Sequence, residues 1–267
     1  MKLNRLSVNG IIHVMERNWM SFRKLFKISI FPNLFDPILY LVAMGLGIGH
    51  FVGQVSGMPY LTFISLGLVA ATAMNAANVE STTNAYIQMR LDKTYYEIST
   101  TPINLEEIIV GQALWSGIRG TIFGSLFLLV TAGMGILQSW IAIFIPIVLL
   151  LTGTLFGFLG LTFTLITPTR DYLNYYSMLV IQPMYMFSNT FFPLTSVAPW
   201  LKNIGWFSPL THAVSLIRQM AIGSLNLESA YDLLWLLIVT IIISLVPQSI
   251  CLLYTSPSPR DKRRCRM

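Results

Sequence analysis

The chain has 267 residues, of which 54% are hydrophobic and only 10% are charged, and its mean hydropathy is +0.66. Soluble domains carry about a quarter charged residues, so this composition excludes an ordinary water-soluble enzyme. Uncharged runs reach the roughly 18–20 residues that cross a bilayer, and they cover residues 51–79, 140–169, 172–201 and 233–259. The composition predicts an all-α polytopic membrane protein, with a single transmembrane domain over residues 1–250.

The net charge of +6 comes mostly from the last part of the chain. Residues 251–267 hold five basic residues against Asp261, and both cysteines, which are too isolated for a disulfide framework or a zinc site. The run from Cys251 to Asp261 matches the translation of a sequencing-library adapter, so we expect residues 251–267 to be a non-native tail. A basic cytoplasmic tail is the alternative. The tail is excluded from fold reasoning, and the remaining charge gives no reason to expect a nucleic-acid partner.

Residues 1–30 carry six basic residues and apolar residues at helical spacing, among them Val8, Met15, Trp19 and Phe22. This pattern predicts a basic amphipathic helix at the membrane surface, and a solvated arm is the alternative. Proline disfavours helix at the residue before it, so Phe31-Pro32 predicts a break. Asp36-Pro37 then resembles an N-cap followed by proline at the first helical position, and predicts a first span over 36–52.

Five further spans are expected over 60–84, 105–134, 140–166 and 172–192, and from about residue 233. Asn104 and Glu107 have the spacing of a capping box at the start of the third span. The intervening segment, 193–232, contains short amphipathic pieces at 197–206 and 209–222, which cannot cross a bilayer. We expect these pieces to be re-entrant or surface helices, whose irregular backbone faces protein or water.

Lysine and arginine counts orient the chain, because short cytoplasmic loops are enriched in them. The side of the N-terminus has nine, namely six in residues 1–27 with Arg90, Lys93 and Arg170, whereas the opposite side has only Lys202 and Arg218. The count predicts a cytoplasmic N-terminus and six spans. The loop at 86–107 then lies in the cytoplasm, and 193–232 lies on the outer side.

Two features inside the spans suggest a transport path. Arg119 lies about 21 Å into the third span at 1.5 Å per residue, where a lipid-facing cation costs at least about 2.5 kcal/mol. It is expected either to pair with an acceptor such as Glu80 or to line a watery path. Tyr172 and Tyr176, at i and i+4 in the fifth span, fit an interfacial aromatic belt, or stacking on a sugar or lipid.

Sequence motifs for catalysis are missing. No G-x-x-x-x-G-K stretch occurs, so no P-loop of this chain binds ATP. The three histidines, His13, His50 and His212, have no metal-ligand spacing. Gly124-Ser125 lacks the G-x-S-x-G elbow of a serine hydrolase. We therefore expect no cofactor, no metal and no enzymatic activity in this chain.

Five segments resemble the permeases of type-2 ABC exporters, with the nodulation lipooligosaccharide exporter and polysaccharide exporters as the nearest branch. They read FDPILYLVAMGLGIG (35–49), AMNAANVES (73–81), TPINLEEIIVG (101–111), FPLT (192–195) and SPLTHA (208–213). The resemblance implies a multi-pass permease of the bacterial inner membrane, paired with a second permease copy and with separate nucleotide-binding subunits that carry ATP and magnesium. It also implies an N-terminal interface helix, membrane-lipid contacts, re-entrant helices at the outer exit, and a loop between spans two and three that docks on the ATPase.

Because the 86–107 loop is charged, we expect it to be the surface through which the ATPase subunit acts on the permease. The candidate docking residues in this loop are Arg90, Lys93, Tyr95, Glu97 and Pro102. A merely solvated loop is the alternative. Two other function classes stay open: an ion-coupled carrier with a relay of Asp36, Glu80 and Arg119, and an intramembrane enzyme. Within the exporter class we expect a lipid-linked oligosaccharide or polysaccharide substrate, with a drug or antibiotic as the alternative.

Overall fold

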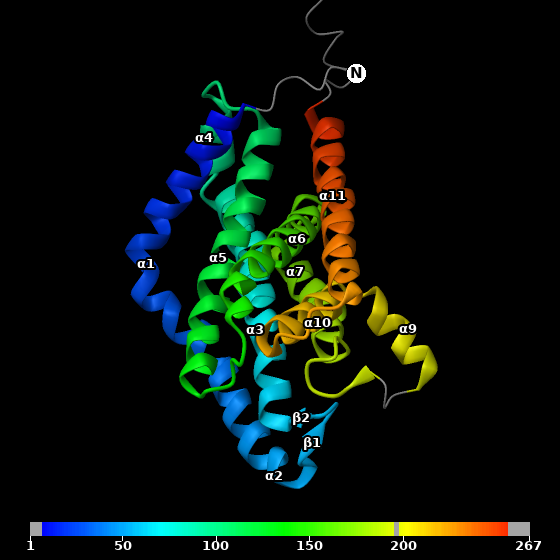
Figure 1. The fold of residues 1–267 in the computed structure, drawn as a ribbon. Coiled ribbons are helices and arrows are strands. Elements are labelled where there is room, and N and C mark those ends of the chain that lie inside the picture. The colour runs from blue at the N-terminus through cyan, green and yellow to red at the C-terminus, as the bar shows by residue number, and fades with distance from the viewer. Residues whose placement is uncertain (1–6, 195–197, 256–267) are drawn as a thin grey trace, which may run out of the picture.

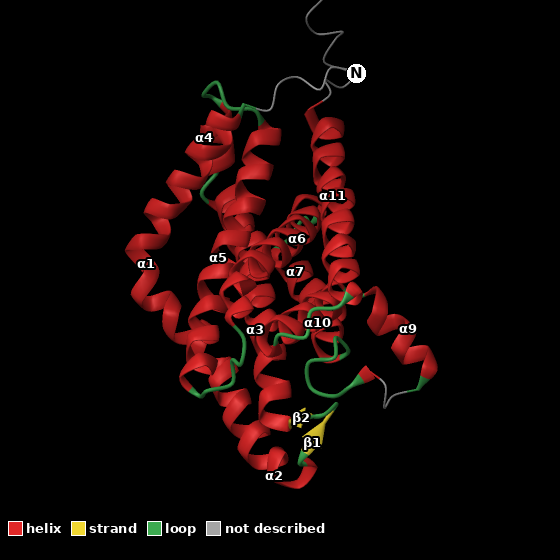
Figure 2. Ribbon diagram, viewed as in Figure 1, coloured by secondary structure: helices red, strands yellow, loops and turns green. Residues whose placement is uncertain are grey.

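The computed structural model describes residues 7–194 and 198–255, and these are almost entirely helical (Figure 2). The two short strands β1 (Gln54–Val55) and β2 (Met58–Pro59) form an antiparallel hairpin that pairs Gln54 with Pro59 and Val55 with Met58. Five helical segments of the described residues are long and apolar enough to cross a membrane, namely Val8–Gly45, Tyr60–Leu91, Leu105–Gly133, Trp140–Ile166 and Leu227–Ile250. The expected helical membrane fold is confirmed, and five of the six predicted spans correspond to these segments.

The first segment is the clearest difference from the sequence prediction. Helix α1 runs without interruption over Val8–Val42, continues as the π-helix η1 (Ala43–Ile48) and ends with α2 (Gly49–Val52). The predicted break before Pro32 is therefore wrong, and Asp36 lies inside a helix rather than at an N-cap. Membrane helices keep their prolines because lost backbone bonds are re-satisfied locally. Figure 1 shows α1 bowing away from the bundle and back, as helices that contain proline do.

Helix α3 (Tyr60–Val79) is the buried centre of the bundle. It is extended by two π-helical stretches, η2 (Glu80–Asn84) and η3 (Ile87–Leu91), so this span is longer than the 60–84 expected. The short helix α4 (Thr94–Ser99) follows at the same end of the molecule as the start of α1 (Figure 1). The segment predicted as a cytoplasmic loop is thus largely helical.

Helix α5 (Leu105–Gly133) begins with the predicted capping box. In it the backbone N–H of Asn104 donates a hydrogen bond to Glu107 Oε2 at 3.0 Å. It packs against the segment made of the 3₁₀ turn η4 (Trp140–Phe144) and α6 (Ile145–Ile166). Glycines allow this close approach: a Cβ on Gly153 would lie 3.0 Å from the Cα of Gly117. Small residues at such contacts are typical of helix pairs in membranes.

The expected fifth span is shorter than predicted. It consists of α7 (Arg170–Tyr176), the π-helix η5 (Ser177–Ile181) and α8 (Gln182–Met186), after which Asn189 adopts a positive φ of 63°. These helices end before the predicted limit at residue 192, so the helical stretch of this span is shorter than predicted. The chain then forms α9 (Pro199–Phe207) and α10 (Pro209–Ile222), close to the two amphipathic pieces expected. Helix α11 (Leu227–Thr255) starts six residues earlier than predicted, and residues 256–267 of the suspected tail lie outside the described chain.

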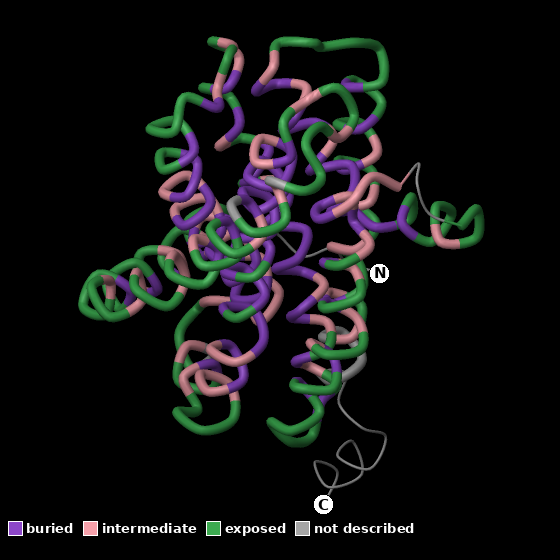
Figure 3. The backbone as a smooth tube through the Cα atoms, turned by 90° about the horizontal axis from the view of Figure 1, so that it is seen from below, coloured by how far each residue is buried: buried purple, intermediate pink, exposed green. Residues whose placement is uncertain are grey.

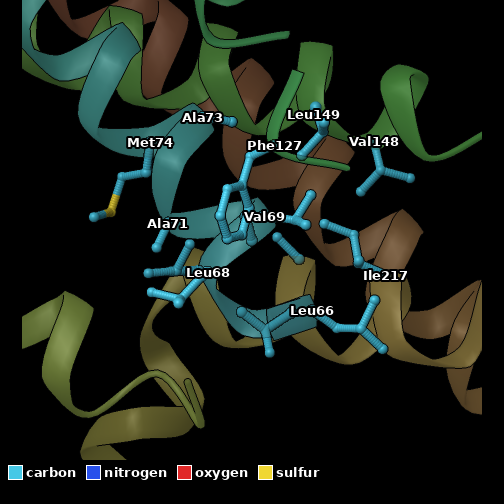
Figure 4. Close-up of a cluster of buried hydrophobic side chains, with 14 of the residues drawn as sticks. Leu66, Leu68, Val69, Ala71, Ala73, Met74, Phe127, Val148, Leu149 and Ile217 are labelled. Carbon is cyan, nitrogen blue, oxygen red and sulfur yellow. The ribbon is translucent and has the colours of Figure 1, made fainter. Parts of the chain in front are cut away.

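The main hydrophobic core gathers around α3. Figure 3 shows the buried residues concentrated in the middle of the molecule. Figure 4 shows Phe127 of α5, Val148 and Leu149 of α6 and Ile217 of α10 against residues of α3 such as Val69. Helices α5, α6 and α10 are therefore all tied to one central helix.

Candidate functional site

Four of the five residues expected to dock an ATPase are exposed at the end of the bundle that carries α4. Arg90 lies in the last turn of η3, Lys93 precedes α4, Glu97 lies in α4 and Pro102 lies in the turn before α5. Lys93 has a left-handed backbone with φ of 52°, which turns the chain from η3 into α4. The structure therefore presents both signs of charge on one short, ordered surface, which we call the α4 surface.

Tyr95, the fifth of these residues, is buried and cannot contact a partner directly. Its side chain is only 5% exposed and packs with Val14 of α1 and Ile108 of α5. Its hydroxyl has no hydrogen-bond partner within the described structure. Burial raises the pKa of the Tyr95 phenol, and the charge of Glu80 raises it further, against an opposing effect of Arg17. Tyr95 thus anchors α4 on the bundle instead of forming part of the α4 surface.

The start of α1 is fixed to the start of α5. The Ser7 amide donates a hydrogen bond to Glu107 Oε1 at 2.8 Å, while the same carboxylate caps α5 through Asn104. The carboxylate of Glu107 lies so close to Gly10 that a side chain there would collide with it. Further along α1, Arg17 Nη1 donates to Gln88 Oε1 of η3 at 3.4 Å. Helix α1, η3 and α5 are therefore joined beside the α4 surface.

Glu80 is the centre of a buried polar network in the bundle. Its Oε1 accepts hydrogen bonds from Gln112 Nε2 at 3.2 Å and from Trp115 Nε1 at 3.1 Å. Its Oε2 accepts one from Asn84 Nδ2 at 2.7 Å and forms an ion pair with Arg119 Nη1. Four donors occupy the lone pairs that a carboxylate offers as acceptors when it is ionised. Arg119 therefore faces protein, with the acceptor that the sequence suggested.

The network extends to α1, because Asn18 Nδ2 donates to Gln112 Oε1 at 2.7 Å. The guanidinium carbon of Arg119 also lies 5.5 Å from the centre of the Phe22 ring, a cation–π distance. A cavity of about 330 Å³, here the Glu80 cavity, opens between α1, η2, η3 and α5, and Arg17 and Asp92 line it with the ion pair. A shift of η2 or η3 would consequently be felt by both α1 and α5.

A second cavity lies on another face of α3, between α1, η5 and α8. It has a volume of about 510 Å³ and is lined by Asp36 and Tyr40 of α1, Asn75 and Asn78 of α3, Gln182 and Tyr185 of α8, and other residues. We call it the Asp36 cavity. Glu80 and Arg119 line only the other cavity, so the structure does not bring the three residues of the suggested ion relay together.

The side chains of Tyr172 and Tyr176 also lie in different surroundings, one exposed and one buried. Tyr172 is 57% exposed and contacts the Tyr175 ring, with centroids 6.3 Å apart. Tyr176 is 5% exposed and stacks on Phe163 of α6 at 4.2 Å. The predicted shared stripe is therefore not a single sugar-binding surface, because packing on α6 covers one ring and leaves the other outside.

Sequence reasoning did not single out a buried cluster in α9, α10 and α11. His212 Nδ1 lies 2.7 Å from Asp232 Oδ1 of α11, and its Nε2 lies 2.9 Å from the Trp206 carbonyl of α9. The imidazole stacks on Trp235 at 4.2 Å. The signal in the sequence was a histidine and an aspartate, 20 positions apart, in largely apolar surroundings. The described residues include no group of three or more side chains suited to a metal ion.

The fold and the two cavities define a multi-pass membrane protein with an ordered surface at one end of its bundle. Residues 10–222 match the ABC-2 type transporter family, and the chain belongs to this family. Its members are membrane transport subunits that work with an ATPase subunit. The chain is 32% identical to Nodulation protein J of Rhizobium meliloti (strain 1021), over 80% of this chain and 81% of that protein.

Other relatives agree. Nodulation protein J of Rhizobium leguminosarum bv. viciae is 33% identical, over 79% of this chain and 81% of that protein. The inner membrane transport permease YadH of Escherichia coli (strain K12) is 25% identical, over 79% and 80%. The chain is thus a type-2 ABC permease related to the nodulation branch, as its sequence segments suggested.

Proposed function

We propose that the chain is the permease subunit of an ATP-driven exporter that moves a lipid-linked oligosaccharide or polysaccharide across the bacterial inner membrane. Two copies form the transport unit, each N-terminus is cytoplasmic, and a separate nucleotide-binding subunit binds ATP and magnesium. The observation that carries the proposal is the α4 surface: exposed charges at Arg90, Lys93 and Glu97 are braced from inside by Tyr95 and by the network of Glu80.

This arrangement suits force transmission. A push on α4 is passed through Tyr95 to α1 and α5, with which it packs. A push on η3 reaches α1 through the contact between Gln88 and Arg17, and reaches α5 through η2 and Glu80. Because the packed core resists gradual deformation, movement at the surface is transmitted to whole helices. Helix α1 makes these contacts and also lines the Asp36 cavity. This cavity is the segment of the substrate path that such a movement would reshape.

The coupling role is tested by replacing Arg90, Lys93, Glu97 and Pro102 together by alanine. We expect the variant to fold, because all four residues are exposed, but to lose co-purification with its ATPase subunit. The matched control replaces exposed residues of α9, which lies away from the α4 surface (Figure 1), by alanine at Trp200 and Lys202. Retained co-purification and retained ATP-dependent export in the fourfold variant would contradict the proposal.

The substrate class is tested by deleting the gene and comparing surface glycans with drug susceptibility. Loss of a surface glycan without increased drug sensitivity is expected. The polar lining of the Asp36 cavity, with asparagine and glutamine amides beside two tyrosines, supports a glycan because amides bind hydroxyls and aromatic faces pack on sugar rings. Unchanged glycans with increased sensitivity to an amphipathic drug would favour drug efflux instead.

A further inference from the structure

Asp36 is an ionisable residue within an apolar helix, where a charge is energetically costly. It is the only charged residue between Lys27 and Glu80, and it lies inside α1 within a segment suited to cross the membrane. Its side chain is exposed in the single chain. Ionisable groups within membrane-spanning segments face a cavity or another protein surface, and mark binding or transport sites by default.

The surroundings of Asp36 contain no compensating cation. The described residues that line the Asp36 cavity include no lysine, arginine or histidine, and no ion pair of the described chain involves Asp36. The groups that line the cavity with it are neutral: amides of Asn75 and Gln182, and the phenols of Tyr40 and Tyr185. A bound cation would therefore pair with Asp36, which has no competing cation among the residues that line the cavity.

A second observation points to a ligand in the same cavity. Asn78 is only 5% exposed and lines the cavity, yet its Oδ1 has no hydrogen-bond partner. Its Nδ2 reaches Ser177 Oγ at 3.5 Å, the upper limit for a hydrogen bond. A buried acceptor without a donor is costly, and a hydroxyl or amine of a bound molecule would satisfy it.

We infer that the Asp36 cavity binds a polar head group that carries a protonated amine, and that Asp36 selects this head group over an anionic one. Asp36 supplies the counter-charge, Asn78 accepts a hydrogen bond from a hydroxyl or from the amine, and Tyr40 and Tyr185 offer aromatic faces. Anionic head groups are rejected because a second negative charge would meet Asp36 without a cation nearby. The inference rests on the proposed export function and adds a charge preference to it.

Three probes that share one sugar and one alkyl chain, and differ in the group on the sugar nitrogen and in its charge, test this selection. They are octyl glucosaminide with a free amine, the same molecule N-acetylated, and the same molecule N-succinylated, which are cationic, neutral and anionic at pH 7. The complete complex of permease and ATPase subunit is reconstituted in nanodiscs. Equilibrium binding is measured without ATP, and stimulation of ATP hydrolysis is measured with it.

With the unmodified complex, we expect the amine to bind about tenfold more tightly than the N-acetylated probe, and the succinylated probe to bind more weakly than both. Asp36→Asn, which keeps shape and removes charge, should abolish the difference between amine and N-acetyl probes without weakening the neutral one. Asp36→Glu should restore the preference. Asp171→Asn removes a similar exposed carboxylate outside the cavity and should change nothing.

The failures are distinguishable. Equal binding of amine and neutral probes to the unmodified complex overturns the inference, as does an amine preference that survives Asp36→Asn. In either case export of a surface glycan, measured in the deletion strain complemented with the gene, decides the proposed function separately. A strain that keeps its glycan without the gene overturns that function, whatever the probes show.

Discussion

Arg119 of α5 and Glu80 of η2, 39 positions apart in the chain, form an ion pair inside the bundle. Neither partner has another opposite charge within ion-pair distance in the described chain. Each charge is consequently held in place by the other, and the pair fixes the π-helical end of the central span against α5.

The first prediction is that removing one charge of this pair lowers the stability of the protein strongly, and that removing both charges lowers it much less. Glu80→Gln leaves the Arg119 charge buried without a partner, and the loss of unfolding free energy should be about 3–5 kcal/mol, as for one-sided removal in other buried pairs. The double variant Glu80→Gln with Arg119→Met should recover much of that loss. Thermal unfolding in one detergent compares four proteins: the unmodified permease, the single variants Glu80→Gln and Arg119→Met, and the double variant. A double variant that is as unstable as the sum of both single variants would contradict the pairing.

The second prediction concerns Tyr95. Tyr95→Ala should lower the unfolding free energy by about 3–5 kcal/mol, because a large aromatic side chain is lost from a packed site. Tyr95→Phe should be neutral or stabilising, since the buried hydroxyl has no hydrogen-bond partner among the described residues. Tyr96→Ala, at the neighbouring exposed position, is the matched control.

The pH dependence of Tyr95 follows from its raised pKa. Because the folded protein holds the phenol proton more strongly than the unfolded chain does, stability is unaffected below the unfolded pKa of about 10 and falls as the pH rises above it. The difference in stability between Tyr95→Phe and the unmodified protein should therefore grow above pH 10, in favour of the variant. A constant difference from pH 8 to pH 11 would show that Tyr95 is not buried as described.

Much of this fold could be predicted from hydropathy and local signals. The third and fourth spans, the capping box at Asn104 and the short helices α9 and α10 follow from apolar runs and helix-end residues. Residues around Pro32 show the limit: proline rules derived for helices in water predict a break, but in a membrane the helix continues with a bend. The fifth span was overestimated because length and hydropathy do not reveal where Asn189 turns the backbone.

The candidate site was predictable only in part. The sequence pointed to Glu80 as an acceptor for Arg119 because isolated charges in apolar spans are few. It did not separate Tyr95 from its exposed neighbours, because one tyrosine in a polar loop looks like another until α1 and α5 pack on it. Asn18, Gln112 and the His212 cluster were not singled out either, since contacts between distant helices depend on how these helices cross.

The third prediction is that His212 holds α9 and α10 to α11. His212→Ala removes contacts to Asp232 and to the Trp206 carbonyl at once, and leaving these groups unpaired should cost about 1–3 kcal/mol each. Hydrogen exchange of α9 should accelerate more than that of α5. His13→Ala, an exposed histidine on α1, provides the control. Equal hydrogen exchange of α9 in the two variants would contradict this role of His212.

The last prediction uses glycines to test how closely α3 and α5 pack. A Cβ on Gly120 of α5 would lie 2.7 Å from the carbonyl oxygen of Ala73 in α3, a contact with backbone that no change of side-chain rotamer can relieve. Gly120→Ala should therefore push the two helices apart and lower the unfolding free energy by about 1–3 kcal/mol. Gly133→Ala, at the end of the same helix, meets nothing within 4 Å and should be neutral or slightly stabilising, because alanine favours helix. Thermal unfolding of both variants in the same detergent compares them, and effects of the same sign and size would refute the close packing of α3 and α5.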